Sequence, residues 1–373
     1  MKILFAAGGT GGHINPALAV AGQIREDYPD AEILFVGTKD KMEAKLVPQA
    51  GFDFTTIKIS GFQRKITIEN IIRNIKTVLY LLMCSSRVKK ILRSFKPDVV
   101  VGFGGYVSGP VVRMAAKMGI PTAIHEQNAY PGITNKTLAK QVDRVMLTAA
   151  EAEKYLAAKN PVLVTGLPVR GEMLRADRDI SRSELGIKDS QKLVLSMGGS
   201  LGAATINNAM VDIIADNVKR EDLYFLHATG QYGLWVPDKL REKGVDPDGT
   251  ANLEIREYIN DMHRCMAAAD IVICRAGAST LSELQAMGKA SILIPSPNVA
   301  ENHQYHNAMA LVNKNAALIL EEKEFTKEKM QELFACLADN DAERKSIEAA
   351  AKAMSTDDAK QKIADCIVSL IKA

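Results

Sequence analysis

The sequence predicts an α/β protein built from two doubly wound parallel-sheet domains in tandem. Two segments share one design, a short apolar strand followed by a glycine-rich turn and a helix, and they begin near residues 1 and 193. Strand and helix patterns alternate in both halves, which is typical of parallel sheets with helical crossovers. The chain has 373 residues, more than one hydrophobic core usually supports, so two domains are expected.

The first of these segments opens the chain. Lys2–Ala7 is a short apolar strand, and Gly8–Gly12 forms the glycine turn. Asn15 and Pro16 follow, and we expect the helix to begin there, because Asn is a good N-cap and Pro suits the first helical position. The glycines interrupt the apolar start without a cleavage site, so we expect a first strand and not a secretory signal peptide.

The second segment repeats the pattern. Leu193–Met197 is the strand, Gly198–Gly202 is the turn, and the helix that follows carries Ile206, Met210 and Ile213 on one face. Further strands are predicted at Glu32–Gly37, Asp98–Gly102, Pro121–His125, Arg144–Leu147, Val162–Thr165, Leu223–His227, Asn252–Arg256, Ile271–Cys274 and Ser291–Pro295.

The segment Pro161–Pro168, with Gly166 inside it, has the composition of a linker. We therefore place an N-terminal domain at residues 1–165 and a C-terminal domain at residues 166–345. From about Asp341 the chain is rich in Ala and Lys and helical to its end. Composition does not decide which domain this tail covers, and we expect residues 346–373 to pack back on the N-terminal domain.

The composition is that of a globular protein and limits the classes of function. Lys and Arg number 47 against 44 Asp and Glu, a net charge of +3, which is too small for a whole-protein nucleic-acid surface. The five cysteines include no CxxC pair, so we expect neither a disulfide framework nor a structural zinc site. No apolar run reaches the roughly 18–20 residues that span a bilayer, and we expect a protein of the cytoplasmic compartment.

Four glycine turns follow predicted strands: Gly8–Gly12, Gly102–Gly105, Gly198–Gly202 and Arg275–Ala278. A turn that opens a helix presents unpaired N–H groups and the positive end of the helix dipole, which suits a phosphate or diphosphate. The turns lack the lysine of a P-loop, and the dinucleotide fingerprint fails at its third glycine, where Ile14 stands. A phosphate compound other than NAD or FAD is therefore favoured, and no cofactor is expected.

The run Arg275–Glu283 has two interpretations. Its turn can contact a diphosphate, and the carboxylate of Glu283, one helical turn further on, can accept both hydroxyls of a ribose. Alternatively Thr280 and Glu283 form a capping box that only closes the start of the helix. Spacing alone leaves both open.

Five ordered stretches together resemble MurG, the family of peptidoglycan glycosyltransferases, over essentially the whole chain. They are Gly8–His13, Gly104–Pro110, His125–Asn128, Gly198–Ala203 and Arg275–Glu283. The resemblance implies the GT-B fold, two Rossmann-like domains with a cleft between them. It also implies inverting transfer of N-acetylglucosamine from UDP-GlcNAc to the C4 hydroxyl of the muramyl sugar of lipid I, which gives lipid II at the inner face of the cytoplasmic membrane.

The resemblance also implies a set of donor-binding residues. Ser200 and the stretch Ala278, Ser279, Thr280, Leu281, Ser282 and Glu283 would hold the diphosphate and ribose, and the backbone of Ile259 would contact uracil. Gln304 would bind hydroxyls of the sugar, and Arg170 would lie near the phosphates. From the N-terminal domain, Thr10, Gly11, Gly12 and Asn128 would reach the donor sugar. The family pattern Gly-Asn-Pro-Val-Arg reads Gly166-Leu167-Pro168-Val169-Arg170 here, so no role is argued for the Asn.

Inverting transfer needs a base for the acceptor hydroxyl. His13 ends the first glycine turn, and an imidazole suits base chemistry near neutral pH; alternatively it only steadies the start of the helix. Glu126, after the strand Pro121–His125, is the rival base, or else a carboxylate that holds a loop. Tyr106 either binds the acceptor or packs, and His125 is expected to be structural.

No metal ion is expected. Asp-x-Asp occurs at Asp177–Asp179 and Asp246–Asp248, but in charged or turn segments away from the phosphate loops. His303 and His306 lack a clear third ligand for zinc. Helix dipoles, backbone N–H groups and Arg275 or Arg170 can stabilise the leaving diphosphate instead.

The stretch Phe62–Lys96 is strongly basic. It holds nine Lys and Arg against Glu69 alone, a charge of +8, and the apolar run Val78–Cys84, which is too short to span a bilayer. Cations around apolar residues suit an anionic membrane surface, so we expect a peripheral protein at the cytoplasmic face. The alternative is a core helix with a solvated basic face. UDP-GlcNAc, lipid I and other cell-wall enzymes are the expected partners, with no nucleic acid.

Three other functions stay open. One is a UDP-GlcNAc 2-epimerase or another sugar transferase with the same fold, although an epimerase needs no lipid-facing surface. Another is a non-catalytic scaffold that docks cell-wall enzymes at the membrane. The third, a nicotinamide-dependent reductase, fits least because the dinucleotide fingerprint is incomplete.

Overall fold

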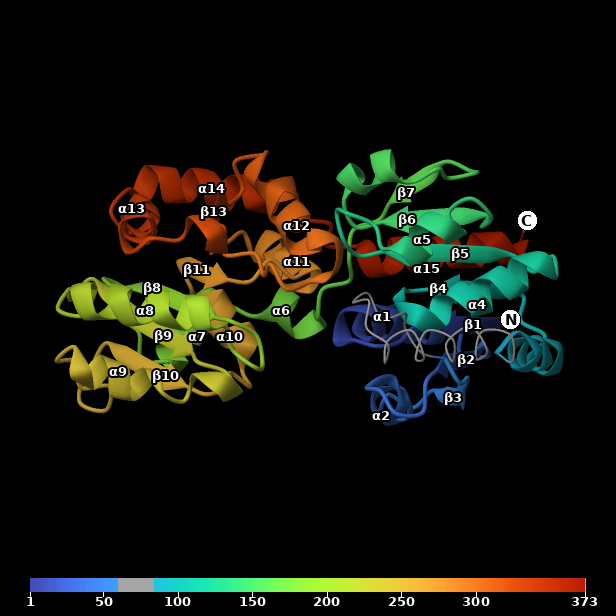
Figure 1. Cartoon of the computed structure of the whole chain (residues 1–373), viewed down its shortest axis with the longest axis horizontal. Helices are drawn as coiled ribbons and strands as arrows, with labels where there is room; N and C mark the ends of the chain where they lie inside the picture. Colours follow the sequence, from blue (N-terminus) through green and yellow to red (C-terminus); the bar gives the residue numbers. More distant parts are fainter. Residues whose placement is uncertain (60–83, 373) are drawn as a thin grey trace, which may run out of the picture. The chain divides into compact units, whose positions relative to one another are not determined.

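The computed structural model describes residues 1–59 and 84–372, and the chain divides into two compact units (Figure 1). One unit is Met1–Pro168 together with Asp358–Ala373, and the other is Val169–Asp357. Each unit contains one parallel sheet with helices on both faces. The predicted fold class, two doubly wound parallel-sheet domains, is confirmed. The chain passes between the units at Pro168, at the end of the Pro161–Pro168 segment.

The first unit has a seven-stranded sheet in the order β3-β2-β1-β4-β5-β6-β7. All its strand pairs are parallel, and the order reverses direction between β1 and β4. The strands are β1 (Lys2–Ala6), β2 (Glu32–Gly37), β3 (Asp53–Thr56), β4 (Val99–Gly102), β5 (Thr122–Glu126), β6 (Arg144–Leu147) and β7 (Val162–Val164).

Helices cover both faces of this sheet because successive residues of β1 point to opposite sides. Ile3 and Phe5 pack in a core with α1 and α15, whereas Leu4 and Ala6 pack in a second core with α4 and the helical residues 84–95. The helices of this unit are α1 (Gly11–Asp27), α2 (Glu43–Gln49), α4 (Gly105–Lys117), α5 (Ile133–Leu138) and α15 (Ala359–Lys372), with a 3-10 turn η1 (Ala150–Tyr155).

The first helix starts earlier than we expected. It begins at Gly11 with Thr10 as an extended N-cap, and Asn15 and Pro16 lie inside it. The carbonyl oxygen of Thr10 accepts hydrogen bonds from the N–H groups of His13 and Ile14, which starts the helical ladder. Pro16 is the sixth residue of the helix and lacks an N–H group, so the carbonyl oxygen of Gly12 receives no i→i−4 bond from it.

The second unit has a six-stranded sheet in the order β10-β9-β8-β11-β12-β13, which reverses direction between β8 and β11. Its strands are β8 (Lys192–Met197), β9 (Leu223–Ala228), β10 (Leu253–Arg256), β11 (Ile271–Cys274), β12 (Ala290–Leu293) and β13 (Leu318–Ile319). Its helices are α6 (Gly171–Arg175), α7 (Arg178–Glu184), α8 (Ala204–Asn217), α9 (Val236–Glu242), α10 (Met262–Ala268), α11 (Ala278–Met287), α12 (His303–Val312), α13 (Lys327–Ala338) and α14 (Asp341–Ala353), with 3-10 turns η2 (Gln231–Gly233), η3 (Ala300–Asn302) and η4 (Glu322–Glu324).

The C-terminal tail is two helices, and they belong to different units. Helix α14 packs on α11 and α13 in the second unit, where Lys352 Nζ donates to the carbonyl oxygen of Ala286 over 2.7 Å. Helix α15 packs on α1 and β4 in the first unit, so Ile363 and Ile367 complete one of its cores. Residues 346–353, which we assigned to the returning tail, therefore lie within α14.

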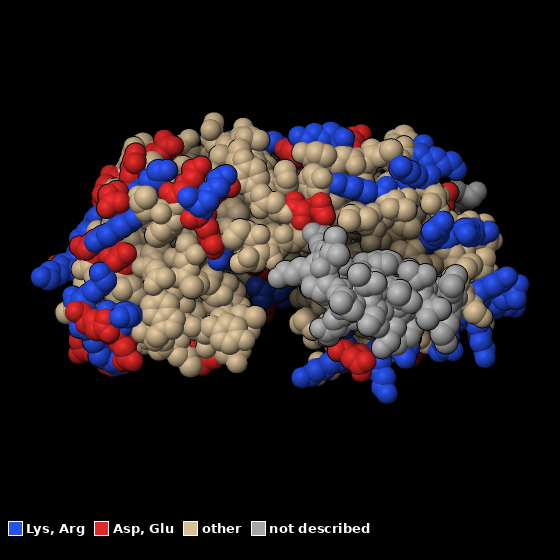
Figure 2. Space-filling view, viewed as in Figure 1, with Lys and Arg blue, Asp and Glu red and all other residues tan. Residues whose placement is uncertain are grey.

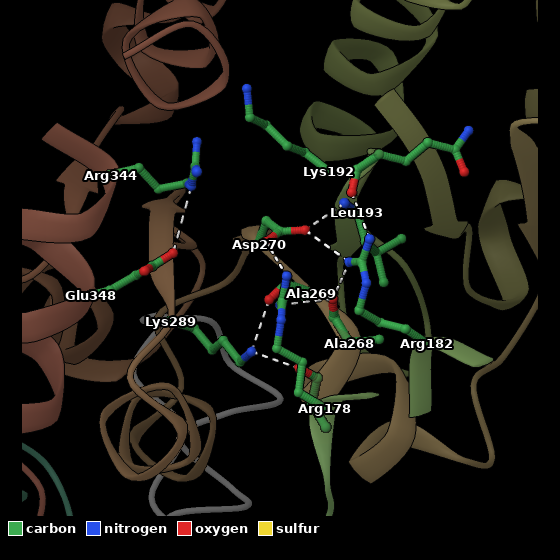
Figure 3. Close-up of polar contacts among 12 residues, drawn as sticks. Arg178, Arg182, Lys192, Leu193, Ala268, Ala269, Asp270, Lys289, Arg344 and Glu348 are labelled. Atoms are coloured by element: carbon green, nitrogen blue, oxygen red, sulfur yellow. Dashed lines mark hydrogen bonds and ion pairs between the residues drawn. The ribbon is translucent and has the colours of Figure 1, made fainter. Parts of the chain in front are cut away.

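A cluster of buried charges ties the amino ends of β8, β11 and β12 together (Figure 3). Asp270 accepts hydrogen bonds from Arg178, Arg182 and the N–H of Leu193, at 2.8, 3.2 and 2.8 Å. The Lys289 ammonium donates to the carbonyl oxygens of Ala267 and Ala269. These contacts stabilise the sheet edge opposite to the one that carries the glycine turns.

Candidate functional site

The four glycine turns lie where the two sheets reverse direction, at the carboxyl ends of the strands. In the first unit, Gly8–Gly12 and Gly102–Gly105 follow the neighbouring strands β1 and β4. The two turns touch, since a Cβ on Gly105 would lie only 2.2 Å from the carbonyl oxygen of Gly8. Only glycine fits there, and its φ of +77° favours glycine as well. Open α/β sheets bind ligands at such switch points.

His13 lies at the end of the first turn, with one ring nitrogen held by the turn. Its Nδ1 is 3.2 Å from the carbonyl oxygen of Gly8 and 3.3 Å from Thr10 Oγ1. Because a carbonyl oxygen can only accept, we assign the proton of the neutral ring to Nδ1. The lone pair then lies on Nε2, as a general base requires.

Glu43 supports the first turn and was not foreseen from the sequence. Its fully buried carboxylate accepts hydrogen bonds from the N–H of Gly9 at 3.1 Å and from the N–H and hydroxyl of Thr38 at 2.9 and 2.7 Å. Burial by itself would raise the pKa of this carboxyl, but the hydrogen bonds from Thr38 and Gly9 outweigh it, and the pKa is lowered. The ionised carboxylate of Glu43 thus holds the glycine turn through the N–H of Gly9.

Glu126 is the second candidate for the base, and both of its carboxyl oxygens accept hydrogen bonds from the segment that follows it. Its Oε1 accepts from the N–H and Nδ2 of Asn128, and its Oε2 accepts from the N–H of Gly132 and from Asn135 Nδ2. Burial raises the pKa of Glu126, and these hydrogen bonds partly oppose the rise. Four donors around a buried carboxyl favour the loop-holding interpretation over base chemistry, and they place Asn128 at the carboxyl edge of β5.

Tyr106 and His125 differ sharply in exposure. Tyr106, the second residue of α4, is 60% exposed, so its ring is available to a ligand and is not a core residue. His125 is fully buried, and its Nε2 donates to the carbonyl oxygen of Gly166 at 2.9 Å. This environment fits the structural role expected for His125.

In the second unit, the start of α11 bears on one of the two interpretations of Arg275–Glu283, the capping box. The helix begins at Ala278 with Gly277 as its N-cap, so Thr280 lies in the first turn and the capping-box interpretation is wrong. The first-turn N–H groups have no partner within the helix and point out of its start. Glu283, 8% exposed, pairs with Arg170 instead, whose Nε donates to Oε1 at 2.9 Å.

Burial raises the pKa of Glu283, and the hydrogen bond from Arg170 opposes the rise. Arg170 is shared, because its Nη1 also lies 3.3 Å from Glu172 Oε1. Its side chain is half-exposed at the N-terminal cap of α6. A cation held by two carboxylates at the edge of a diphosphate-type turn can shift to an anionic ligand.

The other candidates in this unit lie in the segments that follow the carboxyl ends of strands. Ser200 is exposed in the turn after β8, and Ile259 follows β10 with its side chain buried. Gln304 is the second residue of α12, and its Oε1 accepts from the N–H of Ser296 at 2.9 Å. Arg275 donates to the carbonyl oxygen of Ile294 and pairs with Glu322, so it fastens this edge of the sheet.

The Asp-x-Asp pairs have structural roles. Asp177 caps α7 by accepting from the N–H of Ile180, and Asp248 pairs with Arg241 in an exposed turn. Within the described ranges 1–59 and 84–372, no three His, Cys, Asp or Glu side chains group as metal ligands. In the same ranges, no helix is both long and apolar enough to cross a membrane.

The basic stretch Phe62–Lys96 falls partly outside the described residues. Arg64, Lys65, Glu69, Arg73, Lys76 and Val78–Met83 lie outside them. In the described part, Cys84, Val88 and Leu92 are buried in the core, whereas Arg87, Lys89, Lys90, Arg93 and Lys96 are exposed. This part is a core helix with a solvated basic face.

Charge is divided unevenly between the units. The first unit has 25 Lys and Arg against 15 Asp and Glu, a formal charge of +10, and the second has 22 against 29, a charge of −7. On the face shown in Figure 2, basic side chains gather over the unit that holds α4, α5, β6 and β7, and both signs lie intermixed on the other unit. The net charge of +3 conceals this difference.

Comparison with known proteins shows similarity over both units. The N-terminal domain of glycosyltransferase family 28 matches residues 3–147, and the C-terminal domain of that family matches residues 193–364. A protein of Acetivibrio thermocellus, named UDP-N-acetylglucosamine--N-acetylmuramyl-(pentapeptide) pyrophosphoryl-undecaprenol N-acetylglucosamine transferase, is 42% identical and covers 100% of this chain and 99% of its own.

A Thermoanaerobacter protein of the same name is 44% identical, over 99% of this chain and 100% of its own. The crystal structure of MurG from Acinetobacter baumannii superposes with a TM-score of 0.80 at 29% identity, over 99% of both chains.

Proposed function

This chain belongs to the MurG family within glycosyltransferase family 28, and we propose how its two units divide the reaction of that family. The chain transfers N-acetylglucosamine from UDP-GlcNAc to lipid I and makes lipid II for peptidoglycan synthesis, on which cell shape and division depend. The observation that carries this function is the similarity of the whole chain to relatives named for this transfer. The two units match the two domains of one glycosyltransferase family, as a two-substrate enzyme with the GT-B fold requires.

The second unit binds the donor. Glu283 accepts the two ribose hydroxyls, and the first-turn N–H groups of α11 bind the diphosphate, because a helix N-terminus favours an anion. The backbone of Ile259 contacts uracil, Gln304 binds hydroxyls of the sugar, and Ser200 lies at the diphosphate. When ribose takes the carboxylate of Glu283, Arg170 is released and pairs with the phosphates.

The first unit supplies the base and the acceptor contacts. His13 Nε2 takes the proton of the C4 hydroxyl, and the oxygen attacks the anomeric carbon of the donor as the bond to UDP breaks with inversion. The electron pair of that bond leaves with UDP, and α11 and Arg170 stabilise its charge. Thr10, Gly11, Gly12 and Asn128 contact the donor sugar, and Tyr106 contacts the acceptor. Glu126 holds the loop that carries Asn128.

The first unit faces the membrane that carries lipid I. Its charge of +10 attracts anionic lipids, each basic residue near the surface contributing about 1 kcal/mol. The segment Phe62–Lys96 is the contact region of this proposal, with the protein peripheral at the cytoplasmic face. Other cell-wall enzymes are proposed partners at the same surface.

The test is transfer of labelled GlcNAc from UDP-GlcNAc to a short-chain lipid I analogue, with the His13→Ala variant as the matched control. We expect a labelled disaccharide product with the native protein and a strong loss with the variant. No product from the native protein, with or without added Mg²⁺, would contradict the transferase function, and epimerisation of UDP-GlcNAc would then be measured.

A further inference from the structure

Gln127 lies in the core of the first unit, immediately after Glu126, and its side-chain carbonyl oxygen has no donor among the residues that the structure describes. The residue is 4% exposed. Its Nε2 donates to the carbonyl oxygens of Phe103 and His125, at 3.0 and 3.1 Å. Its Oε1 is buried and has no hydrogen-bond partner among the described residues. A buried acceptor without a donor is unfavourable and calls for a functional explanation.

The orientation of this amide is set by its surroundings. Nε2 faces two carbonyl oxygens, which only accept, and it lies 3.2 Å from His125 Nδ1. Burial lowers the pKa of His125 to about 4, and the proton of its neutral ring is on Nε2, which donates to Gly166. His125 Nδ1 is therefore an acceptor too. Turning the amide over would place Oε1 against three acceptors, so Oε1 must point the other way.

Gln127 Oε1 and the Cδ2–Nε2 edge of the His13 ring both border the space that a Cβ on Gly104 would fill. A Cβ on Gly104 would lie 2.7 Å from His13 Cδ2 and 3.0 Å from His13 Nε2, so any side chain would displace the imidazole. The same Cβ position is 3.4 Å from Gln127 Oε1. The two side chains thus approach the same small space, and Gly104, with φ +96°, keeps it open.

We propose that Gln127 is a positioning residue for His13, and that its buried carbonyl oxygen stabilises the imidazole in its protonated form. This inference rests on the proposed role of His13 as the base. When His13 Nε2 takes the proton of the acceptor hydroxyl, the ring becomes a cation. The carbonyl dipole of Gln127, which has no hydrogen-bond donor among the described residues, then has a positive partner.

Other ionisable groups near His13 do not take this role. Glu43 is fully engaged by Gly9 and Thr38 beneath the turn. Glu126 is engaged by its own loop, and His125 stays neutral. The Tyr106 phenol, on α4, is exposed.

The test is the titration of His13 followed by NMR at its Cε1–H, in the full-length protein without substrate. The sequence has six histidines, and loss of one signal in the His13→Gln variant assigns the resonance. Replacing Gln127 by Met keeps the length of the side chain and removes the carbonyl. We expect the midpoint of the His13 titration to fall by about one pH unit, the size of one lost charge-assisted hydrogen bond. The acid limb of the pH profile of kcat shifts with it.

Asn135→Ala is the matched control. Asn135 Nδ2 donates to His125 O and Glu126 Oε2, so its loss loosens the same loop and leaves the Gln127 carbonyl in place. We expect lower thermal stability and an unchanged His13 midpoint. If Gln127→Met does not fold, Gln127→Asn, which withdraws the amide by one methylene, is measured in its place and is expected to lower the midpoint too.

An unchanged midpoint in the Gln127 variant, or an equal shift in the Asn135 variant, would overturn the inference. Loss of the transfer reaction in the native protein is a separate result. It would contradict the proposed function and leave the titration to be judged by itself.

Discussion

Arg170 Nε donates to Glu283 Oε1 over 2.9 Å, and this contact joins the N-terminal cap of α6 to the second turn of α11. The carboxylate that we assign to ribose is thus already paired with the cation that we assign to the phosphates. Binding of the nucleotide has to exchange these partners, so recognition of the ribose and of the diphosphate is coupled.

Glu283→Gln tests this coupling. The amide keeps one acceptor oxygen and loses the charge, so both the ribose contact and the hold on Arg170 weaken. We expect KM for UDP-GlcNAc to rise by about 10- to 100-fold, which corresponds to a hydrogen bond to a charged group. Glu172→Gln, at the exposed second partner of Arg170, is the control and is expected to change KM less than threefold, the effect of a surface pair.

His13→Ala separates chemistry from binding. Loss of a general base lowers kcat by about 10²- to 10⁴-fold, whereas UDP, bound by the second unit, is held as before. Steady-state kinetics gives the first quantity and calorimetric titration with UDP gives the second. Unchanged kcat would exclude His13 as the base.

Glu126 is expected to respond in stability more than in chemistry. Glu126→Ala leaves the donors of Asn128, Gly132 and Asn135 without an acceptor in the core, and we expect unfolding to become easier by about 2–4 kcal/mol. Glu126→Gln keeps one acceptor oxygen, so it should retain at least a tenth of kcat. A Glu126→Gln enzyme that folds normally and is as inactive as His13→Ala would make Glu126 the base.

Metal chelation is expected to leave turnover intact. Asp177 and Asp248 already serve a helix cap and an ion pair, so neither Asp-x-Asp pair is organised for a diphosphate-bound cation. Transfer with excess EDTA should match transfer with Mg²⁺ within twofold. Asp177→Ala should lower stability by about 1 kcal/mol through loss of the cap, without affecting kcat. A rate restored only by Mg²⁺ would contradict this.

Lys289 makes stability depend on pH in the alkaline range. Burial lowers the pKa of its ammonium to about 8, from an ordinary value of 10.5. Between these values the unfolded chain holds a proton that the folded protein has released, so stability rises with pH in this window, by up to about 3 kcal/mol. Denaturant unfolding at pH 7.5 and 10.5 should show that the free energy of unfolding of the native protein rises with pH relative to that of Lys289→Met. An equal difference at both pH values would contradict this origin.

Much of the fold was predictable from local sequence patterns, because a strand followed by a glycine turn is a pattern of consecutive residues. Most strands of both sheets and all four turns follow from such patterns. The strands β3 and β13 were missed because the first is polar and half-buried and the second has only two residues. The predicted start of α1 was wrong. We placed it at Asn15 and Pro16 from the preference of proline for the first helical position, but the helix already begins where the N–H of Ile14 donates to the carbonyl oxygen of Thr10.

The contacts that support the site could not be found in this way. Glu43 reaches Gly9 across 34 positions, and Arg170 reaches Glu283 across 113. Nothing in the neighbourhood of either residue indicates its partner. Gln127 was visible within the stretch His125–Asn128, but its orientation depends on Phe103 and on the space above Gly104.

The return of α15 to the first unit has a consequence for biosynthesis. Ile363 and Ile367 fill a core whose other members come from earlier segments, among them α1, α2 and the strands β1, β2, β4, β5 and β6, so the domain that leaves the ribosome first lacks this piece until α15 has been made. The second unit, Val169–Asp357, is contiguous in sequence and needs no segment made after Asp357. The amino-terminal domain is thus the last to be completed, and a chain that stops before Ala359 would expose the apolar face of α1 to chaperones and proteases.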